Sequence, residues 1–361
     1  MSACSGSSGR GAERRLQSPD RSVSVRARGP SGPHGGLTMH RRFVVLLLLP
    51  FLGCGGAPEL TTDSEAISSH GGRRGETIAL TGPVYYPEGI AAARNGTLYV
   101  GSIGTGAIVR IPSGSSTPEI FVQPRASFGN YGMAVDTPRG LLWVCTYDDT
   151  LIPAQPAALT AYALGTGEVA ASYVMPGPDG FCNDVVVDHQ GNVYATDAFA
   201  NTVVRLRQGA SDLETWATSP LFSAPPYTIT LNGLVFDRGE HRLYVVRSDT
   251  GTLFSIPVNL DGSAGEPVAI PVDGPLELPD GIERVGPHTL LVVENGGRVS
   301  LLELSEGQAA RTVLAEGLST PTTAALADGS AWVVEAQFAA ETPVVPFRLV
   351  RVPLGQQRAG E

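Results

Sequence analysis

The chain has 361 residues, with 44 glycines, 28 prolines and only 17% charged residues. This composition suits many short strands joined by turns better than a helical bundle. The chain contains no lysine, which excludes Schiff-base enzymes, pyridoxal enzymes and Walker A nucleotidases, because each of these classes needs one. The sequence also lacks a Gly-x-Ser-x-Gly elbow and a CxxC pair, which argues against a serine hydrolase and a thiolate zinc site.

The first 54 residues carry an export pattern. Residues 1–38 are rich in Ser, Gly and Arg, and they have too few apolar side chains to form a core, so we expect them to be disordered. Met39 begins a second candidate start, followed by positive charges and the apolar stretch 43–52. That stretch is about half of the roughly 20 residues that span a membrane, so residues 39–54 are predicted to be a signal peptide. We therefore interpret residues 1–38 as an extension wrongly assigned to the gene.

The end of this signal peptide resembles the lipobox of bacterial lipoproteins over Phe51–Cys54. The resemblance implies that Cys54 is the lipidated first residue of the mature protein. We expect this lipid to anchor the chain at the cell envelope, in the periplasm or outside the cell. An ordinary cleaved signal peptide is the alternative, because Phe51 stands where lipoproteins usually carry Leu. Residues 55–75 are then a flexible linker from the lipid to the folded domain.

Removal of the first 54 residues leaves a strongly acidic chain. The removed segment holds eight arginines and two acids, so the remainder has 17 basic and 33 acidic residues and a net charge of −16. Such a domain lacks the basic surface that nucleic acid requires, and small cations are its more natural partners. We expect a monomer that binds a small molecule.

One sequence unit recurs six times in the rest of the chain. Each copy has a small or polar pair, an alternating apolar strand, a turn with Gly and a second strand that ends near Tyr-Val or Trp-Val. The corresponding positions are Glu88, Gly132, Asn183, Asn232, Asp280 and Thr322, with spacings of 44, 51, 49, 48 and 42 residues. Six such units, each with room for four short strands, predict an all-β fold: a six-bladed β-propeller with four antiparallel strands per blade.

The propeller is predicted to cover residues 76–357 and to close through its termini. The segment Glu76–Val84 precedes the first unit and has the pattern of a strand. We expect it to complete the last blade beside Arg348–Pro353. Turns such as 94–96 and 189–192 supply the positive-φ positions that tight hairpins require. No helical period of 10–15 residues separates the strands, which argues against a βαβ sheet.

The six corresponding positions begin the innermost strands, so in a propeller they lie on one face around the channel. Four of them carry side-chain oxygens: Glu88, Asn183, Asn232 and Asp280. Ca²⁺ takes about 6–8 oxygen ligands, and two carboxylates would neutralise a divalent ion. The set predicts one divalent metal site at the channel mouth, with Ca²⁺ favoured over Zn²⁺, Mn²⁺ or Mg²⁺. The alternative is that Asn232-Gly233 and Asp280-Gly281 serve only as turn dipeptides.

Other residues are assigned structural roles. Aromatic residues near the ends of the second strands are expected to pack between blades, namely Tyr99, Trp143, Tyr194, Tyr244 and Trp332. Cys145 and Cys182 could pair in an oxidising compartment, although nothing in the local sequence requires it. His189, His241 and His288 fall in predicted turns, where a histidine is more often solvated than catalytic.

Several motifs together resemble a known family. They are Pro87-Glu88-Gly89, Asn183-Asp184, Asn232-Gly233-Leu234, Pro279-Asp280-Gly281 and Asn295-Gly296-Gly297-Arg298-Val299. Across roughly residues 80–352 the chain resembles the SMP-30/gluconolactonase/paraoxonase-like superfamily (LRE-like region) of six-bladed propellers. The resemblance implies that Glu88, Asn183, Asn232 and Asp280 bind Ca²⁺ or another divalent ion. It also implies that Asp280 is the catalytic residue, acting as a base toward a water that attacks a lactone or ester.

The chain departs from the family in its substrate residues. Sugar-lactonase members carry an arginine two residues before the first asparagine, where this chain has Phe181. Paraoxonases follow their glutamate with an aspartate for a second calcium, where this chain has Gly89 but keeps Asp184. The resemblance therefore supports the family's metal-binding site in this chain more strongly than it supports the family's substrates. Two functions stay open: a metal-dependent lactone or ester hydrolase, or a non-catalytic envelope propeller that binds a ligand or protein partner, with a structural ion.

The lipobox interpretation predicts that Cys54→Ser blocks lipidation. The variant should leave the membrane fraction or accumulate unprocessed, because the thioether-linked lipid can no longer form. Fractionation of cells that express either form, followed by mass determination of the mature N-terminus, measures this. A variant that fractionates and is processed like the natural protein would refute the lipobox.

Overall fold

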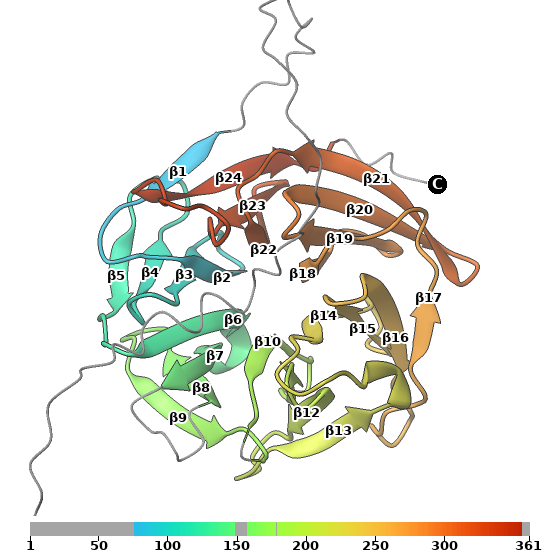
Figure 1. Cartoon of the computed structure of the whole chain (residues 1–361). Coiled ribbons are helices and arrows are strands. Elements are labelled where there is room, and N and C mark those ends of the chain that lie inside the picture. Colours follow the sequence, from blue (N-terminus) through green and yellow to red (C-terminus); the bar gives the residue numbers. More distant parts are fainter. Residues whose placement is uncertain (1–75, 149–156, 178, 356–361) are drawn as a thin grey trace, which may run out of the picture. The chain divides into compact units, whose positions relative to one another are not determined.

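Six four-stranded antiparallel sheets are arranged around a central channel in the computed structural model (Figure 1). The structure describes residues 76–148, 157–177 and 179–355. The predicted extension, signal peptide, Cys54 and linker lie outside these residues, as do residues 356–357 of the predicted propeller domain. Within the described ranges the helices are two short 3-10 turns, η3 (Thr137–Arg139) and η5 (Pro220–Phe222). Neither is long and apolar enough to cross a membrane.

The strands follow the repeat in chain order. Blade 1 contains β2 (Pro87–Ala92), β3 (Leu98–Ser102), β4 (Ile108–Ile111) and β5 (Glu119–Val122). Blade 2 contains β6 (Phe128–Asp136), β7 (Leu141–Asp148), β8 (Ala157–Ala163) and β9 (Val169–Val174). Blade 3 contains β10 (Cys182–Val187), β11 (Val193–Asp197), β12 (Thr202–Leu206) and β13 (Glu214–Thr218).

The second half of the ring repeats this order. Blade 4 contains β14 (Leu231–Phe236), β15 (Arg242–Arg247), β16 (Thr252–Pro257) and β17 (Val268–Ile270). Blade 5 contains β18 (Pro279–Arg284), β19 (Thr289–Glu294), β20 (Arg298–Ser305) and β21 (Gln308–Glu316). Blade 6 contains β22 (Pro321–Ala327), β23 (Ser330–Glu335), β24 (Phe347–Pro353) and β1 (Thr77–Leu80). The predicted fold class is therefore confirmed.

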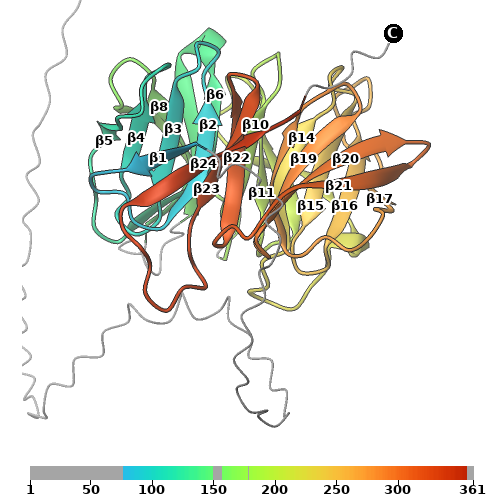
Figure 2. The same ribbon diagram turned by 90° about the horizontal axis from the view of Figure 1, so that it is seen from above.

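The first strand of each unit is the innermost strand of its blade. These six strands, β2, β6, β10, β14, β18 and β22, contact one another in sequence around the ring, and β22 contacts β2. They enclose the channel in Figure 1, and Figure 2 shows the blades from the edge of the ring. The predicted metal-site residues all belong to these strands, so the ring contact brings them toward one axis.

The hydrophobic core lies mainly between neighbouring blades. The cluster between blades 6 and 1, for example, joins Leu80, Ile90, Trp332, Phe347 and Leu349. Every aromatic residue that the sequence assigned to such packing does lie in or against one of these clusters, as Tyr99, Trp143, Tyr194, Tyr244 and Trp332 show. Because each interface is made by two blades, the ring is stable only when it is closed.

The N-terminal strand closes the ring as predicted. β1 pairs antiparallel with β24, with Ile78 opposite Leu349 and Leu80 opposite Phe347. Figure 1 shows the two ends of the described chain side by side in this blade. The alternation of burial along β1 directs Ile78 and Leu80 into the core and leaves Thr77 exposed. The strand contributes apolar burial as well as backbone hydrogen bonds.

Leu80→Ala tests this closure. Leu80 is only 1% exposed, so the variant should lose about 2–5 kcal/mol of unfolding free energy through lost burial and a cavity. Thr77→Ala on the same strand is the control and should change stability by less than about 0.5 kcal/mol. Urea unfolding followed by tryptophan fluorescence gives both values. Equal midpoints for the two variants would contradict a closing role for β1.

Candidate functional site

The six repeat positions lie in β-bulges of the innermost strands. In every blade the register with the second strand shifts at this point, so two residues of the innermost strand lie opposite one residue of the second strand. The bulged pairs are Glu88-Gly89, Tyr131-Gly132, Asn183-Asp184, Asn232-Gly233, Asp280-Gly281 and Thr322-Thr323. A bulge bends its strand and redirects a side chain, and bulges are common beside active sites. The first residue of each pair, or Gly132 in blade 2, is called here a ring position.

The glycines of these pairs are required by close approach of the next blade. A Cβ on Gly89 would lie 2.0 Å from the Tyr131 carbonyl oxygen, and one on Gly233 would lie 2.4 Å from the Asp280 carbonyl oxygen. A Cβ on Gly281 would lie 2.2 Å from Thr323 Oγ1. Only Gly fits where two backbones approach this closely. Asn232-Gly233 and Asp280-Gly281 are thus parts of strands, and the interpretation as turn dipeptides is wrong.

These contacts continue around the channel. A Cβ on Gly132 would meet Asp184 Oδ1 at 2.2 Å, and Thr322 Oγ1 donates to the Glu88 carbonyl oxygen at 2.8 Å. The ring positions therefore lie at one level of the channel. The four oxygen-bearing side chains predicted to bind metal are all buried, with exposures of 6% for Glu88, 4% for Asn183, 6% for Asn232 and 6% for Asp280.

Hydrogen bonds hold the Asp280 carboxylate in place. Asn295 donates through Nδ2 to Asp280 Oδ2 at 2.7 Å and to the Pro321 carbonyl oxygen at 2.8 Å. Asn232 Nδ2 donates to Ser248 Oγ at 3.1 Å, and the Asn232 side chain also hydrogen-bonds Asp280. With the amide nitrogen used in this way, Asn232 Oδ1 is the atom left to ligate a cation.

The Glu88 carboxyl group is buried near other acidic groups and lacks a hydrogen-bond partner for one of its oxygens. Its Oε2 atom is buried and has no hydrogen-bond partner among the described residues. Burial raises the pKa of Glu88 well above its usual range, and the negative charges of Asp280 and Asp184 raise it further. A carboxylate oxygen in this position is costly to keep without a proton or a cation.

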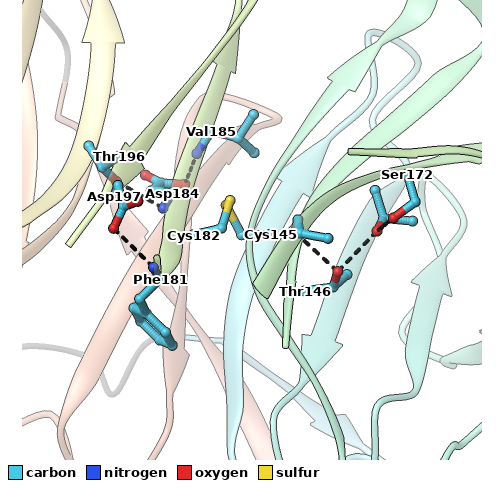
Figure 3. The surroundings of a disulfide bond; sticks show 11 residues. Cys145, Thr146, Ser172, Phe181, Cys182, Asp184, Val185, Thr196 and Asp197 are labelled. Atoms are coloured by element: carbon cyan, nitrogen blue, oxygen red, sulfur yellow. Dashed lines mark hydrogen bonds between the residues drawn. A yellow bond between two sulfur atoms is a disulfide. The ribbon is translucent and has the colours of Figure 1, made fainter. Parts of the chain in front are cut away.

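The backbone at Asn183 is held in place by a disulfide bond of the preceding residue, Cys182. Cys182 forms a disulfide with Cys145 of β7, with the Cα atoms 5.1 Å apart. Figure 3 shows this bond joining the start of β10 to blade 2, with Asp184 on the same strand. The sequence left the pairing open, because a contact between two blades is invisible in the local pattern. Asn183 thus occupies the equivalent bulge position, although its convergence with the other three side chains on one ion stays a prediction.

Two further carboxylates belong to the innermost strands β10 and β18. Asp184 and Glu283 border a cavity of about 140 Å³ together with apolar residues of the innermost strands. Burial raises the pKa of Asp184 to about 7, partly opposed by hydrogen bonds from the backbone of Val185 and Leu234. Burial also raises the pKa of Glu283 to about 8, with a contribution from the charge of Asp184. Burial likewise raises the pKa of Asp280 to about 7.

The residues at the mouth fit a hard divalent ion. Carboxylate and amide oxygens are the ligands that such an ion prefers. The buried Glu88 Oε2 atom, which has no hydrogen-bond partner among the described residues, is available to bind it. Among the described residues, no three His, Cys, Asp or Glu side chains form a metal-binding group by themselves. Any ion here would therefore depend on the amide oxygens of Asn183 and Asn232.

The last residue of each second strand anchors the loops that lead to the mouth, a role the sequence analysis missed. These residues are Ser102, Asp148, Asp197, Arg247, Glu294 and Glu335, and all are buried. Glu294 accepts from the Glu277 backbone N–H at 2.7 Å, and Glu335 accepts from that of Ser319 at 2.9 Å. In four blades the sequence signal for these residues is a polar or charged residue three positions after the aromatic residue of the second strand, as in Tyr99 and Ser102.

The three histidines lie on the surface, as expected. His189, His241 and His288 are all exposed, and His189 contacts Glu240. None of them belongs to the mouth of the channel as defined by the ring positions.

Comparison with known proteins assigns the family. The profile described as "SMP-30/Gluconolactonase/LRE-like region" matches residues 86–329. The chain belongs to this family. The matched range begins just before Glu88 and includes all four predicted metal ligands. A search of curated proteins found no match.

Solved structures of several activities share the fold of this family member. A gluconolactonase from Xanthomonas campestris is 19% identical, with a TM-score of 0.57 over 77% of this chain and 89% of that one. Virginiamycin B lyase from Staphylococcus aureus is 12% identical, with a TM-score of 0.53 over 77% and 98%. A chain of a nidogen/laminin complex is 18% identical, with a TM-score of 0.51 over 66% and 86%. At these identities the likeness shows the fold alone.

The buried carboxylates predict that, with metal removed by a chelator, the stability of the folded protein falls as the pH rises. Between about pH 4 and pH 7–8, Asp184, Asp280 and Glu283 keep their protons in the folded state and lose them when unfolded. The unfolded state therefore binds fewer protons, and stability should fall as the pH rises through this window, by up to about 1.4 kcal/mol per group and pH unit. Urea unfolding in EDTA from pH 5 to 8 measures the slope.

Glu283→Gln is the matched variant for this prediction. It removes one titrating group without changing the shape of the side chain, so its stability should fall less steeply with pH than that of the natural protein. Stability that is constant or rises from pH 5 to 8 in the natural protein would contradict the proposed protonation.

Proposed function

We propose that this protein is a divalent-metal-dependent hydrolase of lactones or related esters, located at the cell envelope. The buried, unpartnered Glu88 Oε2 beside Asp280 carries the proposal, because this pair of charges needs a cation. Family membership supports the reaction class. Glu88, Asn183, Asn232 and Asp280 would hold the ion, with Ca²⁺ as the first candidate. When bound, such an ion polarises a carbonyl oxygen and lowers the pKa of water.

The chain supplies a candidate base in Asp280. Its carboxylate is oriented by Asn295 and Asn232, so its position relative to a bound ester is set before the substrate arrives. A base is most effective when its pKa lies near the working pH, and burial moves the pKa of Asp280 in that direction. Asp280 would accept the proton of the attacking water. Among the described residues Glu88 Oε2 has no hydrogen-bond partner that would orient it, which suits ligation alone.

The proposed location is supported by the disulfide. Cys145–Cys182 is a pair in the core of the domain, and disulfides form and persist in oxidising compartments such as the periplasm and the cell exterior. With the signal pattern and the lipobox-like segment that ends at Cys54, it favours an enzyme held at the envelope by a lipid.

Asp280→Asn and Glu88→Gln together test the proposed site. Each variant keeps one ligating oxygen and removes one negative charge, so Ca²⁺ affinity should fall by at least about ten-fold in both. At saturating Ca²⁺, Glu88→Gln should recover turnover, whereas Asp280→Asn should stay about 10²–10⁴-fold below the natural protein because the base is missing. Calorimetric Ca²⁺ titration and lactone hydrolysis over the same Ca²⁺ range give both quantities.

The outcomes separate the alternatives. Equal recovery of both variants would remove the base role of Asp280 but keep the metal site. Unchanged Ca²⁺ affinity in both would remove the metal site. Tight Ca²⁺ binding by the natural protein without hydrolysis of lactones, aryl esters or phosphotriesters would favour the non-catalytic propeller with a structural ion.

A further inference from the structure

A continuous row of aromatic rings borders the mouth on blades 2 to 4. We call it the aromatic wall, and its members are Tyr131, Tyr147, Phe181, Phe199 and Tyr227. Phe181 stacks on Phe199 with ring centroids 4.9 Å apart and planes at 26°. Tyr131 meets Phe181 edge-on at 5.0 Å, and Tyr227 meets Phe199 edge-on at 5.8 Å. Tyr147 lies 6.0 Å from Phe181.

The wall begins beside the predicted metal ligands. Tyr131 occupies the blade 2 bulge, where its carbonyl oxygen faces Gly89 next to Glu88. Phe181 lies two residues before Asn183, and Figure 3 shows its ring at the starting end of β10, directed away from Val185. Phe199 follows the end of β11, and Tyr227 precedes β14. The rings therefore extend outward from the ring positions over three blades.

One buried carboxylate holds the two central rings. Asp197 Oδ1 accepts from the backbone N–H of Phe181 at 2.9 Å and from that of Ala200 at 3.0 Å. The backbone N–H of Ala198 in turn donates to the Phe181 carbonyl oxygen at 2.9 Å. Because both segments are fixed by hydrogen bonds, the stacked rings are preorganised and lose little entropy when a ligand packs on them.

The outer part of the wall remains open to solvent. Phe199 is half-buried and Tyr227 is 55% exposed. Tyr227 has a positive φ of 61°, which costs energy for a bulky residue and places its ring on Phe199. Tyr227 therefore presents an exposed ring beside the half-buried ring of Phe199. Small-molecule sites are lined mainly by apolar and aromatic side chains, with a few polar groups that orient the ligand.

We propose that the aromatic wall binds the apolar, preferentially aromatic, substituent of the substrate while the ring positions bind its ester or lactone group. This inference rests on the proposed hydrolase function and names its substrate class. A sugar lactone presents hydroxyl groups that need polar partners, and stacked phenylalanines cannot supply them.

The test compares two lactones that differ by a fused ring, dihydrocoumarin and δ-valerolactone. Phe199→Ala should lower kcat/KM for dihydrocoumarin by about five- to ten-fold, the value of one aromatic contact. The same variant should change kcat/KM for δ-valerolactone by less than about two-fold. Each lactone is compared with itself in the natural protein, so their different intrinsic reactivities cancel. Phe199→Leu keeps the apolar packing and should show the same selective loss if Phe199→Ala folds poorly.

Tyr173→Leu is the matched control. Tyr173 is half-buried on β9, the outermost strand of blade 2, and its ring packs against Trp143 with the ring centroids 6.1 Å apart. It should leave the ratio between the two lactones unchanged. Phe181→Arg should reduce dihydrocoumarin hydrolysis more than δ-valerolactone hydrolysis, because a charged side chain replaces the stacked ring.

Binding of unreactive lactams separates this proposal from the hydrolase proposal. Dihydroquinolinone has the shape of dihydrocoumarin, and piperidone that of δ-valerolactone, but both contain a stable amide. Calorimetry in Ca²⁺ should show tighter binding of dihydroquinolinone, lost in Phe199→Leu. That result without hydrolysis of either lactone would support the wall and overturn the hydrolase. Lactone hydrolysis with no lactam preference, or with equal effects of the Phe199 variants on both lactones, would overturn the wall and leave the hydrolase.

Discussion

The close approach of neighbouring innermost strands is the constraint on which this site depends. Beside the ring positions Glu88 and Asn232, the backbone of the next blade leaves no room for a Cβ on Gly89 or Gly233. Each strand accommodates this approach with a bulge. The bulge then directs the preceding side chain toward the channel instead of along the blade. Blade packing and the presentation of polar groups are therefore two results of the same backbone geometry.

The same approach explains the electrostatics of the mouth. Side chains that converge on a narrow channel are removed from water, and Glu88, Asp184, Asp280 and Glu283 are acids. Desolvation and mutual repulsion raise their pKa values, so the folded state without a cation is under electrostatic stress. A divalent ion would relieve this stress and stabilise the fold by the free energy of its binding. Glu88 and Asp280 would then contribute both to stability and to the proposed activity.

The blades differ in the side chain that anchors the loop leading to the channel mouth. Blades 5 and 6 anchor their mouth loops with Glu294 and Glu335, whereas blade 1 uses the hydroxyl of Ser102. Blade 3 uses Asp197, and there the anchored residues are the stacked phenylalanines. The anchoring residue is thus a general device of the fold, and what it anchors differs from blade to blade.

The number of blades, the closing strand and the phase of the ring positions could all be predicted from the sequence. Each of these follows from a repeat, and a repeat is visible along the chain. Glu88 and Asp280 could be placed at one level for the same reason. The Cys145–Cys182 disulfide, the aromatic wall and the bulges were decided only by the tertiary structure. They arise where residues of different blades meet, such as Phe181 with Tyr131, and no local pattern records which side chains face each other across two blades. The exposed position of Tyr227 likewise depends on a backbone conformation that neighbouring residues alone do not impose.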